Sequence, residues 1–200
     1  MSLRIVVGPM FAGKTSDIQS VVRRYKCLGK QVLVLTADID TRYSETSSVI
    51  NHDQVGIDAH GVPIHGGLLT VFDWPEYAAA PAIVIDEAQF FVGCLIPFVK
   101  RAVDIDRKHV VVVGLDSDAD RNPFGDVLAL ISLADSVEKK TALCRRCGDG
   151  TSAIFTHRLI QTTDVSNVVS VGGADQYEPV CRTHFLTLTS SSLPATPRDS

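Results

Sequence analysis

The chain has 200 residues, of which 45% are hydrophobic and 21% charged, and its formal net charge is −4. That length can bury a core without disulfides, and the lack of a basic excess argues against a DNA- or RNA-binding protein. No apolar run reaches the roughly 18 residues of a membrane span and the N-terminal apolar stretch is too short for a signal peptide, so neither a membrane protein nor a secreted one is expected.

Short β-branched runs alternate with helical stretches over the first 142 residues. We expect strands at 3–7, 31–35, 69–72, 82–85, 109–113 and 136–142, and helices at 14–28, 92–103 and 126–134. The polar segment 41–67 is predicted to be mostly loop. Because the strands are apolar throughout, both faces of the sheet must be buried, which predicts an α/β fold with a mostly parallel sheet and helices on both faces.

The sequence changes character after Leu143. Cysteines appear there, with short alternating stretches at 153–156 and 167–171, which predicts a second, smaller unit. From Thr187 the chain is rich in threonine, serine and proline and has little to bury, so we expect a disordered tail. The predicted organisation is a large domain at 1–142, a small domain at 143–186 and a tail at 187–200.

A glycine-rich motif, GPMFAGKT, lies between the first expected strand and the first expected helix. It matches the phosphate-loop pattern Gly-x4-Gly-Lys-Thr in the strand–loop–helix context that the motif requires. Its glycines let backbone N–H groups turn toward a phosphate, and the helix adds the positive end of its dipole. Lys14 is then expected to reach the β- and γ-phosphates of ATP, and Thr15 to bind Mg²⁺. The motif predicts a P-loop (RecA-like) ATP-binding domain.

Two acidic residues, Asp86 and Glu87, directly follow the expected strand at 82–85. In P-loop proteins an acid at this place lies beside the phosphate loop and helps to hold Mg²⁺, which is the role we predict for Asp86. Glu87 then faces the same crevice, because ligands bind at the carboxyl ends of strands in open α/β sheets. It could activate a water, as in an ATPase, or accept a proton from a substrate hydroxyl, as in a kinase.

Three more acids, Asp116, Asp118 and Asp120, follow the expected strand at 109–113. A carboxylate there could organise the same crevice, or the run could be a solvated turn. The residues alone leave both interpretations open.

Two pairs of metal-ligand residues stand in the smaller unit: Cys144 with Cys147, and Cys181 with His184. Two such pairs suit tetrahedral Zn²⁺, and a structural zinc ion would stabilise a unit that is too short to own a large core. A redox role for the first pair is weaker, because no thioredoxin-like βαβ context surrounds it. The chain has five cysteines, an odd number without a secretory signal, which favours a reducing, cytoplasmic location.

The motifs together resemble the zinc-containing (type II) thymidine kinases. The resemblance runs from about Leu3 to His184 and rests on these stretches in this order: GPMFAGKT, DTRYS at 40–44, NHD at 51–53, DEAQFF at 86–91, NPFG at 122–125, CRRC at 144–147 and GGADQYEPVCRTH at 172–184. Their combination is far more specific than the phosphate loop alone.

The resemblance implies transfer of the ATP γ-phosphate to the 5′-hydroxyl of thymidine, with Glu87 as the general base. It implies Mg²⁺ at Thr15 and Asp86 and structural zinc at the four Cys and His ligands. It also implies a lasso-like loop between the two zinc pairs, so that the small domain is a zinc-ribbon-like lasso domain, and a homotetramer that binds neither nucleic acid nor membrane. The implied nucleotide-binding residues are Gly8, Pro9, Met10, Phe11, Ala12, Gly13, Lys14, Thr15, Asp40, Thr41, Arg42, Asp86 and Gln89.

The same resemblance implies the nucleoside site. Phe90 and Phe124 match residues that wall the pocket, 168–171 matches backbone that hydrogen-bonds the thymine edge, and Tyr177 matches a nucleoside contact. The full implied set is Phe90, Ala119, Phe124, Val168, Val169, Ser170, Val171, Gly172 and Tyr177.

The chain departs from the family pattern at three places. Ala119 stands where many relatives have an aromatic residue, so thymidine binding is expected to weaken or the pocket to widen toward other pyrimidine deoxynucleosides. His184 replaces a cysteine that is frequent in cellular relatives, and histidine ligates zinc well. The stretch around His52 follows the family only loosely, so no role is assigned to it.

Two rival functions remain beside the deoxynucleoside kinase. One is a P-loop ATPase with a zinc ribbon that touches DNA, which would place a water beside Glu87; the low net charge disfavours it. The other is a catalytically inactive nucleotide sensor or scaffold. It is disfavoured because four residues are intact: Lys14, Thr15, Asp86 and Glu87.

Overall fold

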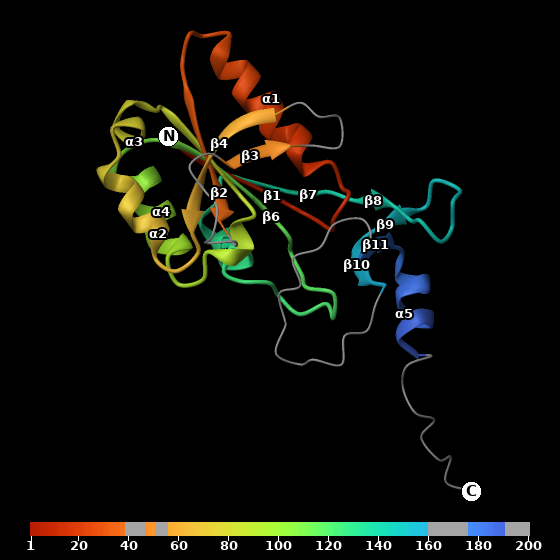
Figure 1. The fold of residues 1–200 in the computed structure, drawn as a ribbon. Coiled ribbons are helices and arrows are strands. Elements are labelled where there is room, and N and C mark those ends of the chain that lie inside the picture. The colour runs from red at the N-terminus through yellow and green to blue at the C-terminus, as the bar shows by residue number, and fades with distance from the viewer. Residues whose placement is uncertain (39–46, 51–55, 160–175, 191–200) are drawn as a thin grey trace, which may run out of the picture.

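The computed structural model describes residues 1–38, 47–50, 56–159 and 176–190. Its centre is a seven-stranded sheet with the strand order β3-β4-β2-β5-β6-β1-β7 (Figure 1). Within the described residues every neighbouring pair is parallel except β3 and β4. The strands are β1 Ser2–Val7, β2 Val32–Asp38, β3 Ser47–Ile50, β4 Gly56–Pro63, β5 Ala82–Asp86, β6 His109–Gly114 and β7 Ser136–Lys139.

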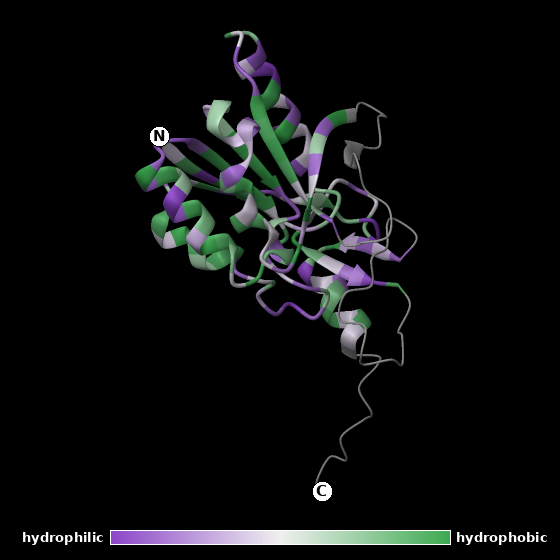
Figure 2. Ribbon diagram, turned by 60° about the vertical axis from the view of Figure 1, so that its left-hand side comes forward, coloured by the Kyte–Doolittle hydropathy of each residue, from purple (hydrophilic) through white to green (hydrophobic). Residues whose placement is uncertain are grey.

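Helices cover both faces of this sheet, as the apolar strands predicted. Helix α1 (Lys14–Lys26) packs Ile18 and Val21 against one face, where Val84 points from β5. The other face is covered by helices α2 (Gly67–Thr70), α3 (Pro75–Ala79) and α4 (Leu95–Lys100). These helices share a core with Ile83 and Ile85 of β5. The alternation of neighbouring β5 residues between two cores explains why the strand is apolar at every position. Figure 2 shows hydrophobic, green ribbon in the central strands and in the helices packed on them.

Two expectations for the first half of the chain were wrong. The segment 41–67, predicted as mostly loop, contains β3 and β4, and the run 69–72, predicted as a strand, is helical. There α2 continues into the 3-10 turn η1 (Val71–Asp73), because Leu68 and Val71, three residues apart, both point into the core. Gly67 also packs against β4, since a Cβ at this position would lie 2.9 Å from Pro63 Cδ.

Two predicted helices differ in type from an ordinary α-helix. In the predicted helix at 92–103, α4 is followed by a π-helical turn, η3 (Arg101–Ile105). The predicted helix at 126–134 is a 3-10 helix, η4 (Val127–Leu133). The strand expected at 136–142 divides into β7 and a separate short strand, β8 (Ala142–Leu143).

The described part of the smaller unit consists of two two-stranded sheets and a helix, below and to the right of the large sheet in Figure 1. β8 pairs with β9 (Ser152–Ala153), and β10 (Phe155–Arg158) pairs with β11 (Tyr177–Val180), both antiparallel. Helix α5 (Arg182–Ser190) follows at once. The tail predicted from Thr187 is therefore helical over its first four residues, and 191–200 lie outside the described part. The core of this unit is small: Ala142, Cys144, Ala153, Val180 and Phe185.

Among the described residues, no helix combines the length and the apolar character needed to cross a membrane. The boundary between the large and small domains at 142/143 stays a prediction, although β8 already contains Ala142.

Candidate active site and metal centre

The phosphate loop connects β1 directly to α1. Gly8 has φ 150°, and a Cβ there would lie 2.5 Å from the carbonyl oxygen of Lys140, so only glycine fits against this neighbouring segment. Gly13 has φ 75° and forms the N-cap of α1. The loop thus ends with the N-terminus of a helix pointing into it, which favours an anion at this place.

Lys14 is the cation of the loop. Its Nζ donates to the carbonyl oxygens of Gly8 (3.1 Å) and Pro9 (2.7 Å). Burial lowers the pKa of Lys14, while the negative charges of Glu87, Asp86 and Asp116 oppose that shift. Three carboxylates from the ends of two strands therefore act on one ammonium group.

Asp86 ends β5 and is 7% exposed. Burial raises its pKa to about 7, the nearby charge of Glu87 adds to the rise, and the Glu87 N–H and Lys14 oppose it. The Glu87 N–H donates to Asp86 Oδ1 over 2.9 Å. Burial disfavours the negatively charged form of this carboxylate, and a bound divalent cation would stabilise that form. The site is therefore suited to a divalent cation.

Glu87 has an unusual backbone. Its φ is 50°, in the left-handed region that residues other than glycine seldom adopt, and its side chain is exposed. The Gln89 side-chain amide donates to Glu87 Oε2, which orients the carboxylate. Strain of this kind concentrates at functional positions, where the surrounding structure enforces it.

Gln89 does not lie open to a ligand, although the sequence predicted it among the nucleotide-binding residues. Its side chain is fully buried, and its Oε1 accepts the N–H of Leu115 over 3.0 Å. Glycines allow this burial: a Cβ on Gly114 would lie 2.7 Å from Gln89 Oε1, and one on Gly125 would lie 2.1 Å from the Gln89 carbonyl oxygen. The side chain of Gln89 thus connects Glu87 to the backbone of Leu115, and its contact with nucleotide stays a prediction.

The three acids after β6 behave differently from one another. Asp116 is 7% exposed and lies 2.6 Å from Lys139 Nζ, and its negative charge also acts on Lys14 of the phosphate loop. Asp118 accepts N–H bonds from Asp120 (2.9 Å) and Asn122 (2.8 Å) and thereby forms the turn. Of the two interpretations left open by the sequence, the structure thus supports the crevice for Asp116 and the turn for Asp118.

The predicted nucleoside residues are partly within the described region. The rings of Phe90 and Phe124 meet edge to face, with centroids 5.4 Å apart, although the two residues come from different loops. Ala119 lies half-buried in the turn, and Tyr177 is buried on β11 with the Arg158 guanidinium 5.8 Å from its ring centroid. The predicted residues Asp40, Thr41, Arg42, Val168, Val169, Ser170, Val171 and Gly172 lie outside the described residues, as does His52.

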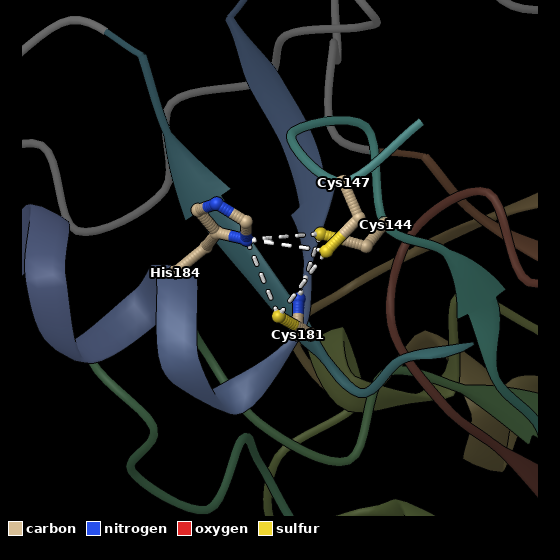
Figure 3. Close-up of side chains that lie close together, drawn as sticks. All are labelled: Cys144, Cys147, Cys181 and His184. Carbon is tan, nitrogen blue, oxygen red and sulfur yellow. Dashed lines mark hydrogen bonds between the residues drawn. The ribbon is translucent and has the colours of Figure 1, made fainter. Parts of the chain in front are cut away.

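The four predicted zinc ligands converge in the small unit, with their ligand atoms pointing toward a common centre (Figure 3). The Sγ atoms of Cys147 and Cys181 are 3.8 Å apart. His184 Nδ1 is 3.6 Å from Cys144 Sγ and 3.4 Å from each of the other two sulfurs. A tetrahedral ion with Zn–S bonds of about 2.3 Å and a Zn–N bond of about 2.05 Å requires edges of about 3.8 and 3.6 Å. The cluster therefore has the size of a Cys3His zinc site.

Backbone groups prepare this cluster for a cation. The Cys181 N–H donates to Cys144 Sγ over 3.3 Å. Although burial acts in the opposite direction, the N–H groups of Cys181, Cys147 and Arg146 lower the pKa of Cys144 to about 6. Since the thiolate is the metal-ligating form, these bonds favour metal binding.

Two contacts between the small unit and the loops of the sheet were missed in the sequence. Thr156 on β10 accepts the backbone N–H of Met10 in the phosphate loop over 3.0 Å. The Arg121 guanidinium, from the turn that holds Ala119, lies 4.7 Å from the ring centroid of Phe185. No local pattern marks either residue, since each contact joins segments far apart in the chain.

Comparison with known proteins gives one consistent answer. The family model described as thymidine kinase matches residues 1–185. The chain is 39% identical over 186 residues to a thymidine kinase a of Arabidopsis thaliana, covering 93% of this chain and 75% of the relative. It is 42% identical over 185 residues to a thymidine kinase of rice, covering 92% of this chain and 66% of the relative. It is 34% identical over 187 residues to a thymidine kinase of Choristoneura fumiferana entomopoxvirus, covering 91% and 95%.

The metal centre leads to a direct test. Purified protein is expected to carry one zinc ion per chain, and Cys181→Ser to lose most of it, because removing one of four ligands leaves the site incomplete. Elemental analysis of dialysed protein measures the ratio. Cys27→Ser is the matched control, since Cys27 is exposed and is not a member of the cluster, and it should retain the metal. Zinc-free wild-type protein, or full occupancy in Cys181→Ser, would contradict the site.

Proposed function

The chain belongs to the thymidine kinase family, and from this we propose that it transfers the γ-phosphate of ATP to the 5′-hydroxyl of thymidine, giving dTMP. One observation carries the proposal at the level of residues. Lys14 lies in the loop after β1, and the charges of Asp86 and the strained Glu87 at the end of β5 act on it. β1 and β5 are parallel to β6, which lies between them. Phosphoryl transfer needs mainly such positioning and neutralisation of charge.

The donor side is assigned to the phosphate loop. The N-terminus of α1 and the backbone N–H groups of the loop receive the phosphates, except at Met10, whose N–H donates to Thr156. Lys14 exchanges its bonds to loop carbonyls for phosphate oxygens. Thr15 and Asp86 would hold Mg²⁺, and the buried, charge-crowded Asp86 carboxylate fits this role. When bound, Mg²⁺ supplies neutralisation of the phosphate charge.

The acceptor side is assigned to Glu87. Its left-handed backbone turns the side chain out of the strand into the open crevice, and the buried Gln89 fixes one carboxylate oxygen. The other carboxylate oxygen can accept the proton of the nucleoside hydroxyl while the hydroxyl oxygen attacks the γ-phosphorus. A base held in this way needs no rearrangement during the reaction.

The nucleoside is assigned to the space beside the aromatic pair. Phe90 follows Glu87 by three residues, so a planar base against the Phe90–Phe124 pair has its sugar near the carboxylate. Backbone at 168–171, with Gly172 and Tyr177, is proposed to complete the pocket by analogy with the family. Polar backbone groups there would penalise a purine, because the wrong edge leaves them unpaired.

A broader pyrimidine deoxynucleoside specificity is the second candidate, and Ala119 favours it. This small side chain lies half-buried in the turn that also carries Phe124, where many relatives place an aromatic ring. Less packing on the base reduces discrimination between thymidine and its analogues.

We also propose a homotetramer and a cytoplasmic location. The tetramer rests on the family resemblance. The location is supported by five cysteines that are all free, which suits a reducing compartment.

A nucleoside panel tests the reaction. With ATP and Mg²⁺, thymidine is expected to be the preferred acceptor, and chromatography of the nucleoside products should show the 5′-monophosphate. The rates with deoxyuridine and deoxycytidine measure how far the specificity extends to other pyrimidine deoxynucleosides, as Ala119 would allow. Deoxyguanosine is the purine control. Nucleoside-independent ADP release that DNA stimulates would overturn the proposal in favour of an ATPase.

Glu87→Gln tests the base. The amide keeps a side-chain oxygen for Gln89 but cannot take the proton, so kcat should fall by about 10²- to 10⁴-fold while the KM for ATP changes little. Initial rates at saturating thymidine measure this. Glu76→Gln, an exposed carboxylate on α3, is the matched control and should keep full activity. A loss of less than about tenfold in Glu87→Gln would exclude Glu87 as the base.

Ala119→Phe tests the pocket. An added aromatic face should pack on the thymine ring and lower the KM for thymidine by about threefold or more. Ala119→Leu adds comparable volume without a π face and should give a smaller gain. If the KM for thymidine is unchanged or higher in Ala119→Phe, Ala119 does not face the base.

A further inference from the structure

A lysine at the edge of the sheet is paired with a buried acid of the crevice. Lys139 is the last residue of β7, and its Nζ lies 2.6 Å from Asp116 Oδ2. Asp116 is buried, whereas the side chain of Lys139 is 54% exposed. The other carboxylate oxygen of Asp116, Oδ1, is buried and has no hydrogen-bond partner within the described part of the chain. The ion pair with Lys139 is therefore the contact that directly offsets the charge of Asp116 there.

This ion pair reaches across the end of β1. In the strand order β6-β1-β7, Val7 of β1 lies opposite Gly114 on one side and opposite Lys139 on the other. Neighbouring strands are about 4.8 Å apart, so the ends of β6 and β7 are separated by about 10 Å, a gap that the two side chains together close. Gly8 directly follows Val7 and begins the phosphate loop. The pair thus lies at the root of the loop that is expected to receive phosphate.

Negative charge is in excess around the cation of this loop. Three carboxylates act on the ammonium group of Lys14, those of Glu87, Asp86 and Asp116. A triphosphate is itself an anion, so each carboxylate beside the loop that is not offset repels it. The proposed function gives Asp86 to Mg²⁺ and Glu87 to the nucleoside hydroxyl, but it gives Asp116 neither. The charge of Asp116 must therefore be offset by the protein.

We propose that Lys139 is a positioning residue for the donor site: by pairing with Asp116 it offsets that carboxylate, and it thereby sets how strongly the phosphate loop attracts a triphosphate. In this role Lys139 touches neither the nucleotide nor the reacting atoms. It acts on affinity rather than on the chemical step, because the charge of Asp116 is offset equally before and during the reaction. The identity of the triphosphate as ATP rests on the proposed function.

Lys139→Met keeps most of the length of the side chain and removes its charge. The dissociation constant for ATP, measured by calorimetric titration without thymidine, should rise by about three- to tenfold, because a buried carboxylate loses its partner. The KM for ATP should rise in parallel, while kcat at saturating ATP should stay within about twofold. Lys139→Arg keeps the charge and should restore the affinity. Wild-type affinity in Lys139→Met, or a loss that arginine does not reverse, would overturn the proposal.

Asp116→Asn tests the sign of the effect. This change removes the charge that Lys139 offsets, so the variant should bind ATP at least as tightly as the wild type. The double variant with Asp116→Asn and Lys139→Met should return to within about twofold of wild-type affinity. A purely structural ion pair would instead give weaker binding in both single variants and no recovery in the double variant, and that pattern would refute the electrostatic role.

Lys30→Met is the matched control for the loss of one positive charge. Lys30 is exposed and stands just before β2, at the end of the parallel strands opposite to the crevice. This variant should bind ATP with wild-type affinity. A loss equal to that of Lys139→Met would assign the effect to the net charge of the chain and overturn the proposal.

Inorganic tripolyphosphate separates this inference from the proposed function, because it carries the charge of a triphosphate without a nucleoside. Its dissociation constant should follow the same order across the variants as that of ATP. A weaker affinity for tripolyphosphate in Lys139→Met supports this inference even if no nucleoside is phosphorylated. An active wild type whose Lys139→Met variant binds both ligands normally refutes this inference and leaves the kinase function standing.

Discussion

The parallel register of β1, β5 and β6 is the constraint on which the site depends. Val7 of β1 lies opposite Gly114 of β6, and Ile85 of β5 lies opposite Val112, so the three strands end at one edge. The phosphate loop, the Asp86–Glu87 pair and the Asp116 turn therefore begin side by side. The half-buried Lys14 lies among these carboxylates, and their negative charges oppose the lowering of its pKa by burial.

The small unit contacts the loops at this edge of the sheet. Among its described residues, the hydrophobic core cluster has five buried members, so a metal ion at the Cys and His residues would add to a small core. Yet this unit contacts both sides of the crevice: Thr156 holds the phosphate loop, and Phe185 packs under Arg121 of the turn that carries Ala119. Stability gained at the Cys3His cluster can thus reach both the phosphate loop and the turn after β6.

Much of the fold followed from pattern, but not all of it. The strands around Val84 and Val112 were predicted because central parallel strands are apolar at every position. β4 was missed because it lies near the edge of the sheet and its sequence, GIDAHGVP, is interrupted by polar residues and glycine. The run 69–72 was predicted as a strand from its apolar residues, yet Leu68 and Val71 are buried in a helical arrangement. Short apolar runs do not distinguish the two periods.

By itself, the sequence determined the candidate chemistry: a phosphate loop with Lys14, two acids at a strand end, and two pairs of Cys and His residues that could hold zinc. Each is a local pattern whose spacing fits one backbone conformation, so it can be recognised before the chain is folded. Only the tertiary structure decided which residues hold these groups in place. Gln89 meets Leu115 across 26 positions and Thr156 meets Met10 across 146, and neither contact leaves a periodicity in the chain. Long-range contacts depend on how strands and loops pack, and that packing is decided by the whole core rather than by any one segment.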